Sequence, residues 1–141
     1  MIRGSLSHLD LTVTDLERSS HFYDRVLGQL GFRRLDALGA GAPCWALADS
    51  DGGHFNIALQ QAFPEQPAHN RRAPGLHHVA FHADTRADVD AFHSFLTDAD
   101  LPVLDPPAEY DYTPGYYAVF FPDPDGMKLE VVFEPTLRGR V

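Results

Sequence analysis

Eight histidines are spread along the 141-residue chain, and three of them stand close together in the stretch GLHHVAFHAD. These are His77, His78 and His82, and a further histidine, His8, opens the similar stretch SHLDLTV. Imidazole nitrogens bind divalent metal ions and exchange protons near neutral pH. A lone strand histidine is more often an ordinary surface or core residue, so the role of each depends on which residues share its face.

The two histidine-bearing stretches begin two similar halves of the chain. Subtracting 70 from the second-half numbers pairs His78 with His8 and Phe92 with Phe22. Each half predicts a strand, a helix and three further strands, which is a βαβββ module; the alternative is coincidence between two amphipathic units. The first-half elements are expected at about 7–13, 14–31, 32–36, 44–49 and 54–60. Those of the second half are expected at about 76–83, 84–100, 102–104, 115–121 and 127–134.

The fold class predicted from this repeat is α+β, with two tandem βαβββ modules forming an open barrel-like sheet around a cavity. One domain would span residues 1–141, with modules at about 4–60 and 76–134 joined by the linker 61–75. The sequence TDLE predicts a capping box at the first helix, with Thr14 as the N-cap and Glu17 at the third helical position.

Composition and charge limit the classes of function. The chain has 44% hydrophobic and 22% charged residues and a net charge of −9, so it has the makeup of a globular protein with no basic surface for nucleic acid. We find no signal peptide and no apolar run of membrane-spanning length, and we expect no membrane association. Cys44 is the only cysteine, which excludes an internal disulfide framework and favours a cytoplasmic location.

Alternation along the strands predicts one apolar face toward the helices and one polar face away from them. The polar faces would carry His8, His78 and Glu130 into a shared concave pocket. Two imidazoles and one carboxylate form a common divalent-metal triad with open positions for water and substrate. The ion would be Zn, Ni, Mn, Co or Fe(II).

Three motifs carry a resemblance to a known family: FY..VLG..GF in the first helix, GLHHVAFHAD, and DPDG.K.E near the end. With these the chain resembles the vicinal oxygen chelate superfamily, which includes glyoxalase I, bleomycin resistance proteins, extradiol dioxygenases and fosfomycin resistance enzymes. The resemblance implies His8, His78 and Glu130 as metal ligands. A fourth ligand, usually glutamate in glyoxalase I, would fall near Ala58, which cannot bind metal.

The function that this resemblance implies first is glyoxalase I-like lyase or isomerase chemistry on a small substrate with vicinal oxygens, with glutathione or another thiol as a possible cosubstrate. Glu130 and His82 are the expected catalytic residues. The alternatives are an Fe(II) ring-cleaving dioxygenase, a metal-free binder of the bleomycin-resistance kind and, less favoured, thiol transfer to fosfomycin. Members this small usually form homodimers, in some cases with sites shared between chains.

Other side chains are expected to line the substrate pocket. His54 begins a strand on the polar face, and Lys128 shares the face of Glu130 and could attract an anionic substrate. The loop 105–117 is rich in proline and tyrosine and precedes the strand that leads to Glu130, so it is expected to cover the site. Its phenols would then serve as hydrogen-bond donors or stack on a ligand; packing is the alternative role. They are Tyr110, Tyr112 and Tyr116.

Overall fold

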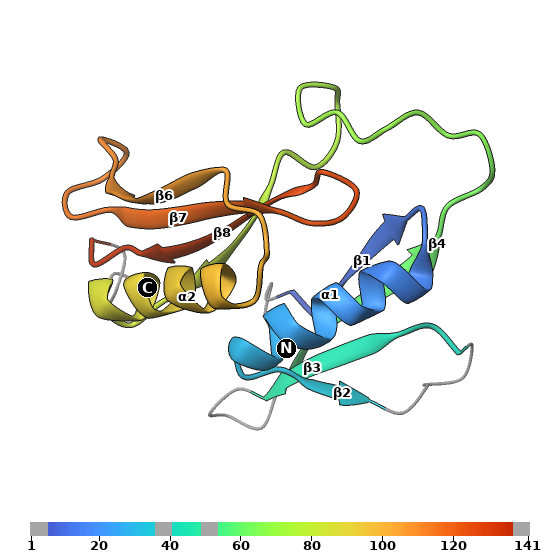
Figure 1. Ribbon diagram of the computed structural model, residues 1–141, viewed down its shortest axis with the longest axis horizontal. Coiled ribbons are helices and arrows are strands. Elements are labelled where there is room, and N and C mark those ends of the chain that lie inside the picture. The colour runs from blue at the N-terminus through green and yellow to red at the C-terminus, as the bar shows by residue number, and fades with distance from the viewer. Residues whose placement is uncertain (1–5, 36–40, 49–53, 137–141) are drawn as a thin grey trace, which may run out of the picture. The chain divides into compact units, whose positions relative to one another are not determined.

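The computed structural model of the protein describes residues 6–35, 41–48 and 54–136. The chain divides into two compact units, residues 1–67 and 68–141, each with one helix and four strands (Figure 1). The first unit contains β1 (His8–Val13), α1 (Leu16–Gln29), β2 (Arg33–Leu35), β3 (Cys44–Ala48) and β4 (His54–Gln61). The second contains β5 (Val79–His82), α2 (Arg86–Asp98), β6 (Asp105–Glu109), β7 (Tyr117–Pro122) and β8 (Lys128–Phe133). The predicted α+β class and the βαβββ order of both halves are confirmed.

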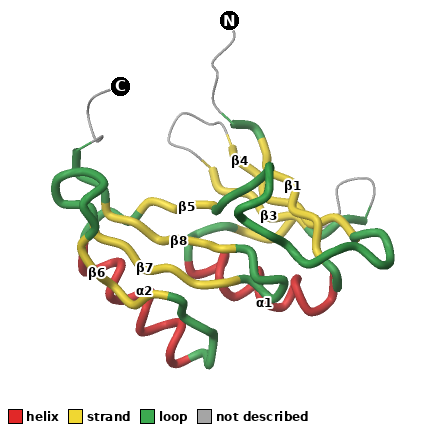
Figure 2. Tube along the Cα trace, turned by 90° about the horizontal axis from the view of Figure 1, so that it is seen from above, coloured by secondary structure: helices red, strands yellow, loops and turns green. Residues whose placement is uncertain are grey.

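The two sheets have the same strand order. In the first unit the order is β1-β4-β3-β2, and in the second it is β5-β8-β7-β6. The first and last strands of each unit pair in parallel, and the remaining neighbours pair antiparallel. The helix of each unit packs along one face of its own sheet, as Figures 1 and 2 show for α2 and the β5–β8 sheet. The internal repeat is therefore present in the topology as well as in the sequence.

The strand register relates the last strands of the two modules. Glu130 lies opposite Ala80 in the second sheet, while Ala58 lies opposite Asp10 in the first. Asp10 and Ala80 are equivalent by the offset of 70, so Ala58 is the first-module counterpart of Glu130. Each module therefore has one position of this kind, and only the second fills it with a carboxylate.

Both helices begin at a side-chain cap. The N-cap of α1 is Asp15, whose carboxylate accepts a hydrogen bond from the Arg18 amide at 2.9 Å. The prediction of Thr14 was wrong by one residue, because either side chain can cap and the aspartate takes the role. At α2, Thr85 and Asp88 form a reciprocal capping box. Neither helix in the described ranges is long and apolar enough to cross a bilayer.

The core of each unit lies between its helix and its sheet. In the first unit, the buried residues alternate along β1 and β4 as predicted, and the Tyr23 and Trp45 rings pack at 6.0 Å between centroids. In the second, Phe92 of α2 meets Phe121 of β7 at 5.3 Å. Strand β8 differs from the expected alternation, because the four residues 129–132 are all buried. Its face away from the helix is therefore covered rather than open to water.

The strand expected near 102–104 lies instead at β6, inside the segment predicted to be a loop. It contains Pro106 and Pro107, which cannot donate to a ladder and argue against a central strand. However, β6 is the edge strand of its sheet, and its register shifts between Asp105 and Ala108, so the prolines are accommodated. The covering segment is thus shorter than predicted and comprises residues 110–116.

Candidate metal and substrate site

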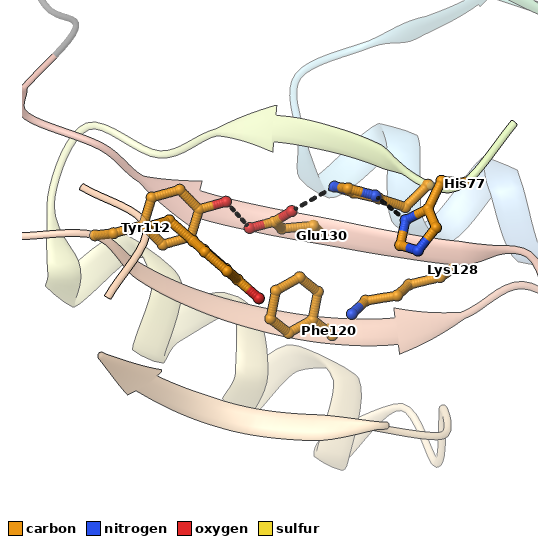
Figure 3. Close-up of a pocket in the computed structure, with 7 residues that line it drawn as sticks. His77, Tyr112, Phe120, Lys128 and Glu130 are labelled. Carbon is orange, nitrogen blue, oxygen red and sulfur yellow. Dashed lines mark hydrogen bonds and ion pairs between the residues drawn. The ribbon is translucent and has the colours of Figure 1, made fainter. Parts of the chain in front are cut away.

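The second unit contains a pocket with a volume of about 290 Å³, close to the lower end of the range for small-molecule sites (Figure 3). It is lined by His77, His78, Tyr112, Tyr116, Phe120, Lys128 and Glu130. These residues come from the segment before β5, the 110–116 turn, β7 and β8. The polar groups converge on one carboxylate, while rings form much of the remaining wall.

His78 and Glu130 form the polar centre of the pocket. Nε2 of His78 lies 3.1 Å from Oε2 of Glu130, and the glutamate side chain is only 1% exposed. The Tyr116 hydroxyl donates a short hydrogen bond to the other oxygen, Oε1 (Figure 3). Oε2 is buried and has no hydrogen-bond partner among the described residues. An oxygen in this state is costly to bury unless another group binds it.

The electrostatics of the site favour uncharged side chains around this oxygen. Burial raises the pKa of Glu130, although the hydrogen bond from Tyr116 and the charge of Lys128 act in the opposite direction. Burial and the bond to Glu130 raise the pKa of Tyr116, which therefore stays a phenol. Burial, followed by the charges of Lys128 and Arg71, lowers the pKa of His78, so its imidazole is neutral at pH 7.

These two side chains fit a divalent metal ion. The donor set is a neutral imidazole nitrogen and a carboxylate oxygen that lacks a partner. Two ligands bound to one ion at about 2.1 Å lie about 3 Å apart when their bonds meet near a right angle, which matches the 3.1 Å between Nε2 and Oε2. The second module would supply two ligands to such an ion, and its described residues bring no third His, Cys, Asp or Glu to them.

His77 orients the ring of His78. The Nδ1 atoms of the two rings lie 2.7 Å apart, and the rings meet edge to face at 5.0 Å between centroids. If Nε2 of His78 is to bind a metal as a neutral imidazole, its proton must be on Nδ1. Nδ1 then donates to Nδ1 of His77, whose own proton is on Nε2. A partner of this kind fixes both the tautomer and the orientation of a ligand histidine.

Lys128 and three aromatic rings form the other wall of the pocket. The Lys128 ammonium lies 3.6 Å from the centre of the Phe120 ring (Figure 3). Tyr112 and Tyr116 meet edge to face, with 5.1 Å between centroids. Burial and the charge of Arg71 lower the pKa of Lys128, while Asp105 and Glu130 act against this change.

The tight turn between β7 and β8 positions Lys128 and Glu130. This turn is the DPDG motif, and its first residue, Asp123, is 3% exposed. The Asp123 carboxylate accepts hydrogen bonds from the amides of Asp125 at 2.9 Å and Met127 at 2.8 Å, while Gly126 has a positive φ of 81°. The motif thus has a structural role, because it fixes the start of the strand that carries both pocket side chains.

Three predicted histidines lie elsewhere. His8 and His54 begin β1 and β4 in the first unit, and both are exposed. His82 shares the outer face of β5, opposite Val132, but is not among the residues that line this pocket. The second module therefore contributes His78 and Glu130 of the predicted triad, and His8 belongs to the other module.

The predicted tyrosines divide into two groups. Tyr112 and Tyr116 line the pocket. Tyr110 instead packs on the buried residues of the outer sheet face and stacks on Tyr112, with 5.7 Å between centroids. Burial and the charge of Asp105 raise its pKa. Tyr110 is therefore a packing residue that supports the wall formed by Tyr112 and Tyr116.

Two lining residues were not predicted from the sequence. Strand alternation would turn His77 away from His78, but both residues precede β5, where no ladder enforces alternation. Phe120 lies in the strand expected at about 115–121, whose faces the sequence alone does not distinguish. Its register partner is Glu130, so pairing β7 with β8 by hydrophobic alternation would have placed it beside the carboxylate.

Two βαβββ modules with this strand order define a class of small proteins built from repeated modules, which includes both enzymes and binding proteins. The chain belongs to the Glyoxalase/Bleomycin resistance protein/Dioxygenase superfamily, whose sequence model matches residues 5–131. It is 34% identical over 133 residues to the Bacillus subtilis protein YqjT, described as uncharacterized, and the match covers 90% of this chain and 97% of that protein.

Solved structures agree with this assignment. A Bacillus halodurans protein described as a "putative glyoxalase" is 30% identical, with a TM-score of 0.76 and coverage of 92% of this chain and 96% of that one. A glyoxalase/bleomycin resistance protein from Albidiferax ferrireducens is 28% identical, with a TM-score of 0.64 and coverage of 92% and 98%. Lactoylglutathione lyase from Agrobacterium tumefaciens, at 23% identity, shares the fold with a TM-score of 0.60 and coverage of 92% and 93%.

Proposed function

We propose that the protein is a divalent-metal-dependent enzyme that performs lyase or isomerase chemistry of the glyoxalase I kind on a small substrate with vicinal oxygens. The observation that carries this proposal is the buried Oε2 of Glu130, which has no hydrogen-bond partner among the described residues and lies 3.1 Å from Nε2 of His78. A metal ion bound by both of these atoms would explain why the carboxylate oxygen is buried without a hydrogen bond. His8 is proposed as the third ligand.

The bound ion would be Zn, Ni, Mn, Co or Fe(II), and it would act as a Lewis acid toward substrate oxygens. The protein side chains hold and orient the site. Tyr116 fixes the rotamer of Glu130 through Oε1, and His77 fixes the tautomer of His78. In that tautomer, His77 presents its Nε2–H as a donor for a substrate oxygen.

The proton acceptor must differ from that of glyoxalase I, where a second glutamate ligand helps to move the substrate proton. The counterpart of Glu130 in the first module is Ala58, which has no acidic group. His82, His54 or a tyrosine is proposed as the base instead, and the two histidines are each exposed on their strands. An alanine at this position also favours a second candidate function, an Fe(II) ring-cleaving dioxygenase, which uses two histidines and one carboxylate.

Elemental analysis of the purified protein tests the metal site. We expect one divalent ion per chain after loading with Zn, Ni, Mn, Co or Fe(II), and its loss in His78→Ala. His82→Ala is the matched control, because it removes an imidazole at the end of β5 that is not part of the pocket lining. A protein that takes up none of these ions, or a His78→Ala variant that retains its ion, would refute the proposal.

Two activity assays then separate the chemistries. Consumption of the methylglyoxal–glutathione adduct by the loaded protein supports the lyase, and oxygen uptake with catechols by the iron form supports the dioxygenase. If a loaded, folded protein turns over neither, the glyoxalase I-like activity is wrong for these substrates. Glutathione is proposed as a cosubstrate only in the first case.

A further inference from the structure

We infer that the pocket of the second unit selects small aromatic monoanions, carboxylates above all. The negative group of the ligand would bind Lys128, and its flat ring would lie against the rings of the 110–116 turn. The inference rests on the proposed function for the role of this pocket as a substrate site, and it adds the chemical class of the substrate. The net charge of the protein is −9, so a lysine that lies inside a pocket runs against the charge of the whole chain.

The charge comes from a single amine held in place. Lys128 is the only lysine of the chain, and its side chain lies in the pocket rather than on the open surface. Its ammonium lies over the Phe120 ring at 3.6 Å, which fixes its direction without using up its hydrogen-bond donors (Figure 3). An ammonium has three donors, so it can still bind a carboxylate oxygen.

Two arginines add positive charge near this pocket. Arg71 acts electrostatically on Lys128, His77 and His78, and Arg72 acts on Lys128 and His77. Asp105 and Glu130 act on Lys128 with the opposite sign. Three cations, Lys128, Arg71 and Arg72, therefore act at this pocket against two carboxylates, and this excess of positive charge favours an incoming anion.

The rings specify the body of the ligand. Tyr112 is 67% exposed, and its ring stands edge to face with Tyr116, so the two planes form a corner that opens on the pocket. Tyr110, which packs on the buried residues of the sheet, stacks in parallel on Tyr112 and supports that ring. A flat conjugated ligand gains offset or edge-to-face contacts with such a corner, beyond what its buried area contributes.

The single lysine provides a direct probe. Reductive methylation with ¹³C-formaldehyde labels Lys128 and the N-terminal amine while the lysine keeps its positive charge. We would titrate benzoate and its neutral isostere benzamide into the metal-free, EDTA-treated protein and follow the Lys128 signal. Benzoate should shift the signal saturably and bind about tenfold or more tightly than benzamide, because a hydrogen bond to a charged group contributes that order of affinity.

Variants test the same point on the unlabelled protein by ligand-detected NMR. Lys128→Met should lose benzoate binding by about tenfold or more, and Lys128→Arg should retain it. Arg33→Met, which removes the same charge from β2 in the first unit, is the matched control and should bind as the wild type does. If Lys128→Met does not fold, the benzoate and benzamide titrations of the labelled wild type decide.

The inference is overturned if benzamide binds as tightly as benzoate, if neither compound shifts the Lys128 signal, or if folded Lys128→Met binds benzoate like the wild type. Zinc binding measured on the same samples separates the two proposals. Selective benzoate binding without metal uptake supports this inference and removes the proposed function. Metal uptake without selection for benzoate over benzamide supports the proposed function and removes this inference.

Discussion

Replacing Glu130 by glutamine should stabilise the metal-free protein at neutral pH. The side chain is 1% exposed, and burial raises its pKa above the ordinary value of 4.5. In the unfolded chain the carboxyl loses its proton near pH 4.5, whereas in the folded chain it retains the proton to higher pH. The unfolded state thus binds fewer protons in that window, so wild-type stability falls as the pH rises from 4.5 through the folded pKa.

The size of the effect follows from the unpartnered oxygen. Glutamine cannot ionise, its oxygen can accept the bond from Tyr116, and its amide can donate to the neutral ring of His78. Since a buried polar atom without a partner costs about 1–3 kcal/mol, we expect Glu130→Gln to raise the free energy of unfolding by about that amount above the window. Below pH 4.5 both side chains are neutral, and the two proteins should differ little.

Urea unfolding followed by circular dichroism, in EDTA across the pH series, measures this difference. Glu65→Gln is the control, because Glu65 is an exposed carboxylate in the segment after β4. Saturating zinc should reverse the sign, because the ion stabilises the ionised carboxylate of the wild type. A difference that does not change with pH, or a less stable Glu130→Gln protein throughout, would contradict the burial argument.

Three further changes test how the site is held in place. Asp15→Ala should lower the free energy of unfolding by about 1 kcal/mol through loss of the α1 cap, and a loss confined to Thr14→Ala in the same urea titration would contradict the cap assignment. Asp123→Ala should lower the free energy of unfolding by about 2–3 kcal/mol, because two backbone N–H groups in the β7–β8 turn lose their buried hydrogen-bond acceptor. An unfolding curve like that of the wild type would refute this role. Gly115→Ala should lower the free energy of unfolding by about 1–3 kcal/mol, because φ is +82° and the added Cβ would lie 2.9 Å from Pro135. Thermal unfolding measures this loss, and an unchanged midpoint would show that the turn adapts freely.

Hydrophobic periodicity predicted most of the fold, because it depends on residues that must be buried. The alternation of Leu9, Leu11 and Val13 defined β1, and the helical spacing of Val89, Phe92 and Leu96 defined α2. Local chemistry was less decisive where two residues can do the same task. Thr14 and Asp15 are both good caps, and only the folded chain shows which one accepts the Arg18 amide.

The candidate site was only partly predictable because its properties depend on contacts between strands. The repeat identified His78, the alternation along the last strand and the DPDG.K.E motif identified Glu130, and the structure brings these two side chains together. The burial of Glu130 could not be read from β8, since it results from the tyrosines of the 110–116 turn, which cover the outer face of the sheet. The position of His77 depends on backbone that precedes the ladder, where the period of two does not apply.

The strand order of the second module has a consequence for its synthesis. β8 lies between β5 and β7, and β5 has no other neighbour in the sheet. A ribosome therefore releases β5, α2, β6 and β7 before the strand that joins them exists. Non-local pairing of this kind slows folding and leaves strand edges open to aggregation while the chain is incomplete. Lys128 and Glu130 arrive on that last strand, so a nascent chain gains the pocket and its complete four-stranded sheet in a single event.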